Sequence, residues 1–182
     1  MTTAHAAPER DRTTTPDLPP GWTIDRPEVA DGARLWRLAR DSRTLDVNSS
    51  YSYLLWCRDF AETSAVARDA DGAPVGFVTG YLRPDAPGTL LVWQVAVGAP
   101  YRGLGIAGAL LDRLCAHVAE THAIDAVETT ITPDNPASER LFGAFARRHD
   151  ARVRRTVLFP AGAFPAPGHE AEVLHRIAPL AF

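Results

Sequence analysis

The stretch TLLVWQVAVGAPYRGLGIAGALL, residues 89–111, decides the fold that the sequence predicts. Residues 89–97 are apolar on both faces except for Gln94, which is typical of a strand in the middle of a sheet. A short turn and a glycine-rich loop follow, and a helix over about 105–120 then places four apolar side chains on one face. These are Ile106, Leu110, Leu114 and Val118.

The glycine-rich loop predicts an anion-binding site. Gly103 and Gly105 let the backbone approach a ligand closely and adopt dihedral angles that other residues resist. The unpaired N–H groups at the start of the following helix point to one spot, where the helix dipole favours a phosphate or diphosphate. Arg102 adds positive charge beside the loop. Without further context, an ordinary turn that uses glycine for its geometry explains the same residues.

The rest of the chain predicts alternating helices and strands. Apolar periodicity indicates helices over 31–42 and 51–60, and strands over 64–68, 74–82, 126–131, 153–159 and 173–177. Asp71-Gly72 is a hairpin signal between the first two of these strands. Asn135 can cap a further helix that has Pro136 at its favoured first position and Leu141, Phe142 and Phe145 facing inward.

Length and composition indicate one domain over 21–182, preceded by a disordered tail over 1–20 that is rich in Thr, Pro and Ala. All 19 basic residues are arginine, and the absence of lysine excludes pyridoxal enzymes and ordinary P-loop kinases and ATPases. A net charge of −3 gives no attraction to nucleic acid or anionic membranes. Cys57 and Cys115 are expected to be buried thiols in a reducing cytoplasm, with no metal site.

Two motifs in the correct order resemble the GCN5-related N-acetyltransferase (GNAT) superfamily. Arg102-Gly103-Leu104-Gly105-Ile106-Ala107 matches its acetyl-CoA loop, [QR]-x-x-G-x-[GA], and Asn135-Pro136-Ala137-Ser138 matches the motif that opens its next helix. The resemblance implies an α/β (α+β) fold with a mixed, mostly antiparallel central sheet, a splayed strand pair and flanking helices. It also implies a bulge around 95–97, with the pantetheine arm inserted between the splayed strands.

Acetyl-CoA is the co-substrate that this resemblance implies, with no metal and no covalent enzyme intermediate. The amine then attacks the thioester directly in a ternary complex, and the backbone N–H near Val97 stabilises the oxyanion. The implied cofactor-binding residues are Val95, Val97, Arg102, Gly103, Leu104, Gly105, Ile106, Ala107, Asn135 and Ser138.

Four stretches carry a more specific resemblance, to the L-2,4-diaminobutyrate acetyltransferases of ectoine biosynthesis. They are residues 45–55, 92–97, 128–135 and 169–172, and the similarity covers about residues 22–178. This resemblance implies acetyl transfer to the γ-amino group, which gives N4-acetyl-L-2,4-diaminobutyrate, and a homodimer.

A diamine substrate needs carboxylates, because an alkyl amine with a pKa near ~10.4 must lose a proton before it attacks. Asp46 and Glu170 are the expected amine-recognising carboxylates, either of which can relay the proton, with Tyr51 as a further catalytic candidate. Trp93 can stack on an ammonium, and His169 can line the substrate. The alternatives are a helix cap for Asp46, a solvated charge for Glu170 and core packing for Trp93.

Phe142 stands where many GNAT enzymes have the tyrosine that protonates the leaving thiolate, so the general acid stays open between Tyr51, water and none. Two other functions also remain. One is acetylation of another small amine, such as a polyamine or an amino acid. The other is a non-catalytic CoA-binding regulatory module, which would keep both motifs without amine-dependent turnover.

Overall fold

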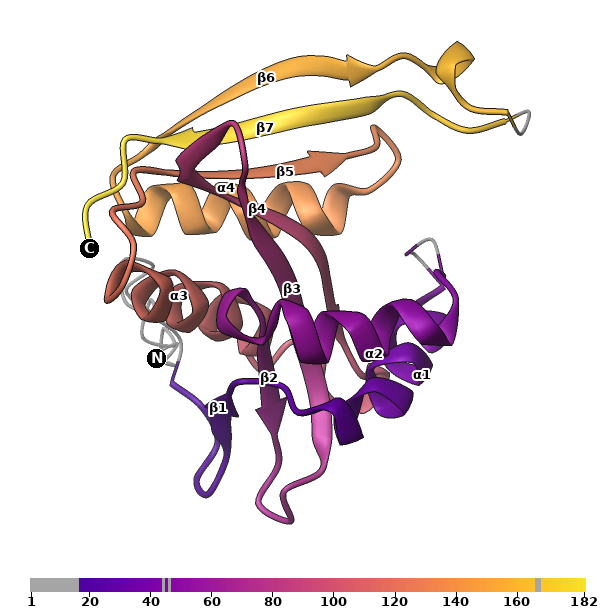
Figure 1. The fold of residues 1–182 in the computed structure, drawn as a ribbon, viewed down its shortest axis with the longest axis vertical. Coiled ribbons are helices and arrows are strands. Elements are labelled where there is room, and N and C mark those ends of the chain that lie inside the picture. The colour runs from indigo at the N-terminus through magenta and orange to yellow at the C-terminus, as the bar shows by residue number, and fades with distance from the viewer. Residues whose placement is uncertain (1–16, 44, 46, 166–167) are drawn as a thin grey trace, which may run out of the picture.

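The computed structural model describes residues 17–43, 45, 47–165 and 168–182 of the chain. They form a seven-stranded sheet with the strand order β1-β2-β3-β4-β5-β7-β6 (Figure 1). The strands are β1 (Thr23–Asp25), β2 (Ala65–Arg68), β3 (Pro74–Arg83), β4 (Ala86–Val97), β5 (Ala126–Ile131), β6 (Arg152–Phe159) and β7 (Glu172–Ala178). All neighbouring strands in this sheet are antiparallel except β4 and β5, so the predicted mixed sheet with its central strand is confirmed.

Helices pack on both faces of the sheet. The helices are α1 (Gly32–Ser42), α2 (Ser50–Asp59), α3 (Ile106–Ala119) and α4 (Pro136–Arg148). Val66 and Phe77 lie in the core cluster with α1 and α2, whereas Ala67 and Val78 lie in the cluster with α3 and α4. Because adjacent strand residues point to opposite faces, α1 and α2 cover one side and α3 and α4 the other. The hairpin of β6 and β7 extends beyond the helices (Figure 1).

The middle of the sheet has a splayed pair of strands. The parallel ladder between β4 and β5 joins only Thr89–Leu91 to Ala126–Glu128. Beyond these pairs, Val92 and residues 94–97 of β4 pair with β3 alone, and residues 129–131 of β5 pair with β7 alone. This is the strand separation that the GNAT resemblance implies, and it leaves backbone groups of both strands for a ligand.

The bulge on β4 lies at Trp93, and the prediction of a bulge around 95–97 is wrong. Thr79 pairs with Gln94, the next residue Gly80 pairs with Val92, and Trp93 is therefore the extra residue. Regular pairing resumes at once, because Val95 faces Val78 across the ladder. Both positions lie within one apolar run, so the sequence alone does not distinguish them.

The N-terminal boundary also differs from the prediction. Leu18, Trp22 and Ile24 pack against the larger core cluster, and β1 pairs antiparallel with β2. The domain therefore begins by Leu18 rather than at residue 21, while residues 1–16 of the predicted tail lie outside the described part. A three-residue strand has too short an alternation to be recognised in the sequence. Within the described residues, no helix is long and apolar enough to cross a membrane.

Candidate active site

The glycine loop has the geometry that an anion site needs. Gly103 and Gly105 have φ angles of 81° and 83°, in the left-handed region that glycine occupies without strain. Gly105 directly precedes Ile106, the first residue of α3, whose first N–H groups have no partner within the helix. The loop therefore presents backbone donors and the positive end of a 14-residue helix to one place.

A cavity of about 330 Å³ lies against this loop. Six of the predicted cofactor residues line it: Val97, Arg102, Gly103, Gly105, Ile106 and Ala107. The Nε of Arg102 donates to the carbonyl oxygen of Val97 at 3.2 Å, which ties the loop to the end of β4. The cavity thus runs from the splayed strand to the helix start, as a ligand with a phosphate end and a long arm requires.

Four predicted cofactor residues lie away from the cavity walls. Val95 is half-buried and packs against the larger core cluster, whereas Leu104 is exposed. Asn135 and Ser138 lie at the start of α4, where Oδ1 of Asn135 accepts a hydrogen bond from the backbone N–H of Ser138 at 3.1 Å. Helix capping by Asn135 is therefore confirmed, and contact of these four residues with a cofactor stays a prediction.

Five further residues that line the cavity were not predicted from the sequence. They are Tyr101, Gly108, Leu141, Ala144 and Arg148. Leu141, Ala144 and Arg148 follow one another at helical spacing, so they share one face of α4. The helical spacing of Leu141, Ala144 and Arg148, counted from the predicted cap at Asn135, could have placed these three residues on one face of the helix.

Trp93 is 50% exposed, and its reading as a core residue is wrong. Its ring lies 6.0 Å from the ring of Trp56 on α2, which also contacts Phe60 at 4.7 Å and Tyr81 at 6.4 Å. The bulge on β4 and this aromatic cluster place an indole at the surface beside the splayed strands. An exposed indole face of this kind can attract an ammonium group.

Two tyrosines of α2 have opposite surroundings. Tyr51, in the first turn, is 64% exposed, whereas Tyr53 is buried. The hydroxyl of Tyr53 donates to Oε1 of Gln94 on β4 at 2.9 Å, and burial raises the pKa of Tyr53 above its usual value. Tyr53 thus fixes α2 to the splayed strand, and a substrate role for the exposed Tyr51 stays a prediction.

Of the two predicted carboxylates, the structure describes only Glu170. Asp46 lies outside the described residues. Glu170 is exposed on the loop between β6 and β7, and neighbouring His169 stacks on Phe164 at 3.6 Å between ring centroids. The loop end of β6 and β7 and the first turn of α2 extend to the same side of the molecule (Figure 1). Within the described part, no hydrogen bond or ion pair joins Tyr51, Trp93 and Glu170.

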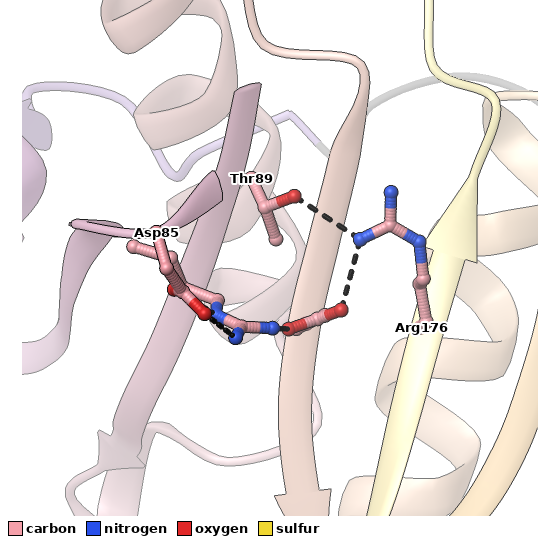
Figure 2. A network of polar contacts seen from close by, with 5 residues as sticks. Asp85, Thr89 and Arg176 are labelled. Atoms are coloured by element: carbon pink, nitrogen blue, oxygen red, sulfur yellow. Dashed lines mark hydrogen bonds and ion pairs between the residues drawn. The ribbon is translucent and has the colours of Figure 1, made fainter. Parts of the chain in front are cut away.

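Glu128 on β5 forms a polar network where the parallel ladder ends (Figure 2). Its carboxylate is 3% exposed and accepts from Nη1 of Arg83 at 2.9 Å and from Nη1 of Arg176 at 2.8 Å. Arg176 also donates to Thr89, and Arg83 pairs with Asp85. The network joins β3, β4, β5 and β7 across the short ladder between β4 and β5, and no residue pattern in the sequence predicts it.

Phe142 is buried in the core cluster around α3 and α4. Its ring has no proton to give, so α4 supplies no general acid at this position. The described residues also contain no group of three or more His, Cys, Asp and Glu side chains that could hold a metal ion.

Residues 32–146 match the model of the acetyltransferase (GNAT) family. The chain is 59% identical over 180 residues to an L-2,4-diaminobutyric acid acetyltransferase of Streptomyces avermitilis, covering 99% of both chains. It is 65% identical over 157 residues to the enzyme of that name from Streptomyces coelicolor, covering 86% of this chain and 92% of the relative.

Solved structures give a matching result. Diaminobutyrate acetyltransferase EctA from Paenibacillus lautus, solved with its substrate L-2,4-diaminobutyric acid and coenzyme A, superposes with a TM-score of 0.82 at 39% identity. That alignment covers 88% of this chain and 96% of the other. Ard1 from Thermoplasma volcanium, at 21% identity and a TM-score of 0.71, shares the fold.

Proposed function

The chain belongs to the acetyltransferase (GNAT) family and, within it, to the L-2,4-diaminobutyric acid acetyltransferases, and on that premise we propose its reaction. The protein transfers the acetyl group of acetyl-CoA to the γ-amino group of L-2,4-diaminobutyrate, in the biosynthesis of ectoine. The observation that carries the proposal is 59% identity along 99% of both this chain and a relative of that name.

The residues of the cavity fit acetyl-CoA. A diphosphate needs several donors around one point, which the backbone of 102–107 and the start of α3 supply. The thioester supplies an activated acetyl group at the far end of a flexible arm. The splayed end of β4, which reaches Val97, then offers its backbone to the arm, and the N–H of Val97 is the proposed oxyanion donor.

The amine must lose a proton to expose its lone pair. Asp46 and Glu170 recognise the two amino groups, and one of them, directly or through water, takes the proton of the γ-ammonium. The nitrogen then bonds to the thioester carbon, the C–S bond breaks, the thiolate leaves with its electron pair, and the nitrogen gives its second proton to water or to the thiolate. Because a thiol has a reference pKa of ~8.5, the thiolate can leave unprotonated or take a proton from Tyr51 or water.

Trp93 and His169 complete the proposed substrate site. The exposed indole of Trp93 faces an ammonium group, and His169 lies next to Glu170 on the loop between β6 and β7. Asp46→Asn is expected to raise the KM for diaminobutyrate or lower kcat without weakening acetyl-CoA binding. Wild-type kinetics for this variant would return Asp46 to a capping role alone.

We further propose that the protein is a cytoplasmic homodimer. Support for a dimer comes from the family resemblance and from β6, an edge strand with exposed Val157, Leu158 and Phe159. Light scattering coupled to size-exclusion chromatography tests the assembly, and a monomeric mass at micromolar concentration would contradict it. Fractionation of the producing cells tests the location.

Thiol release from acetyl-CoA tests the reaction itself, with L-2,4-diaminobutyrate, ornithine, lysine, putrescine and no amine as the panel. We expect rapid turnover with diaminobutyrate alone and an acetyl group on the γ-nitrogen by NMR. Turnover only with other amines would leave a GNAT acetyltransferase of different specificity. Tight acetyl-CoA binding without turnover would favour the non-catalytic binding module.

A further inference from the structure

The cavity beside the glycine loop is lined by a buried cation, Arg148, at the C-terminal end of α4. Neither sequence motif includes this residue. The side chain of Arg148 is 7% exposed and lines the cavity on the same helical face as Leu141 and Ala144. We propose that Arg148 binds a phosphate group of CoA and thereby adds to the affinity of the enzyme for its acetyl donor. The proposal rests on the function proposed above, because it concerns the same cavity.

Asp112 on α3 orients this guanidinium. Its carboxylate accepts from Nε of Arg148 at 2.8 Å and from Nη2 at 3.0 Å, which is a two-pronged pairing that fixes the guanidinium plane. Nε2 of His149 lies 3.0 Å from the same carboxylate, which is itself 6% exposed. Nη1 of Arg148 has no acceptor among the described residues, so it is available to a ligand in the cavity.

A buried ion pair is a costly way to join two helices. Removing both charges from water is unfavourable, and an apolar pair of similar size is often at least as stable. The pairing is advantageous if the cation also meets an anion, because the guanidinium is then held in place before the ligand arrives. The last turn of a helix also favours a positive charge.

Arg148 is better placed for this role than Arg102, the cation of the loop motif. Arg102 is exposed to water and donates its Nε to the carbonyl oxygen of Val97. Arg148 lines the same cavity from α4, in a drier environment where a charge-assisted hydrogen bond is stronger. A phosphate in this cavity would then have both the backbone donors of the glycine loop and a fixed guanidinium as possible partners.

The test compares the affinities of three acetyl donors by calorimetry, without any amine. Acetyl-CoA has all the phosphates, acetyl-dephospho-CoA lacks the 3′-phosphate, and S-acetylpantetheine has none. Arg148→Gln alone leaves Asp112 buried and unpaired, so the double variant Asp112→Asn, Arg148→Gln is measured beside it. Arg147→Gln, a change at the exposed neighbouring residue, is the matched control.

We expect both Arg148 variants to raise the Kd of acetyl-CoA by about ten-fold to a hundred-fold, with S-acetylpantetheine and the Arg147 control unchanged. An unchanged Kd for acetyl-dephospho-CoA would assign the contact to the 3′-phosphate, and an equal loss would assign it to the diphosphate. Unaltered acetyl-CoA binding, or an equal loss with all three donors, would overturn the proposal. Because no amine is present, the result does not depend on which amine the enzyme acetylates.

Discussion

Gly103 and Gly105 both give the glycine loop its backbone conformation. A substitution at Gly103 tests the effect of that conformation with the least disturbance of neighbouring atoms. An added Cβ would meet no atom within 4 Å, yet the φ angle of 81° is one that side chains with a Cβ disfavour. Gly103→Ala should therefore lower the free energy of unfolding by about 1–2 kcal/mol and weaken acetyl-CoA binding as the loop relaxes. Urea denaturation and calorimetry measure the two effects.

Gly162 supplies the matched control, because its surroundings are equally open and its φ angle is outside the left-handed region. Gly162→Ala should leave acetyl-CoA affinity unchanged and keep or slightly raise stability. Equal behaviour of the two variants would contradict the assigned role of the left-handed loop.

Asn135 combines a measurable structural role with a proposed cofactor role. Asn135→Ala removes the cap on the Ser138 N–H and should cost about 1 kcal/mol of stability, together with a higher KM for acetyl-CoA. Asn135→Asp keeps a capping oxygen but loses the side-chain amide donor. Full stability with a raised KM in the Asp variant would separate the two roles, whereas wild-type kinetics in both variants would remove Asn135 from the cofactor site.

At the scale of elements, α4 is tied to the outer hairpin by Glu139. Its carboxylate lies 3.0 Å from Nε2 of His175 on β7 and 3.2 Å from Nη2 of Arg155 on β6. These hydrogen bonds, with His175 as the larger cause, hold the pKa of Glu139 below its ordinary value. The contact therefore stabilises the fold above the ordinary glutamate pKa, and the contribution is lost as the pH falls through the lower, folded-state pKa.

Urea unfolding of the wild type and of Glu139→Gln, from about pH 6 down to about pH 3, measures this contribution. The wild type should be more stable at the upper end, and the difference between the two proteins should shrink toward zero as Glu139 becomes protonated. A difference that is constant over the whole range would show that the ionised carboxylate does not stabilise the fold.

Elements with strong local signals were predictable from the sequence. Asn135 followed by Pro136 marked the start of α4, and Asp71-Gly72 marked the hairpin of β2 and β3. The loop motif at 102–107 carried the family resemblance, which in turn predicted the splayed strands, and the cavity lies at that loop.

Features that depend on contacts distant in the chain were not predictable. The bulge at Trp93 is set by pairing with β3, and any residue of that apolar run fits the pattern equally well. Arg148 reaches the cavity because Asp112, on a different helix, holds it there. β1 is recognisable as a strand only once β2 is present to pair with it. Each of these depends on tertiary contacts rather than on local propensity.

For the molecule as a whole, Glu128 links the strands on both sides of the short ladder between β4 and β5. Glu128→Gln weakens hydrogen bonds from Arg83 and Arg176 at once and should lower the free energy of unfolding by about 2 kcal/mol. Asp85→Asn touches the same Arg83 from a position that is 70% exposed, so its effect should stay below about 0.5 kcal/mol. Chemical denaturation measures the free energy of unfolding of both variants. Equal losses of stability would show that the burial of Glu128 does not add to its stabilising effect.

The short ladder between β4 and β5 makes the protein's own sheet incomplete. Among the described residues, the backbone ladder between its two halves consists of the pairs Thr89–Ala126 to Leu91–Glu128, and beyond them β4 and β5 no longer pair with each other. The pantetheine arm of the acetyl donor would occupy that gap like an extra strand without side chains. Within residues 92–97, the amide hydrogens that do not bond to β3 should then exchange slowly with deuterated solvent only when the donor is bound. A cell that runs short of acetyl-CoA would thus hold this enzyme in its more open, more readily degraded form.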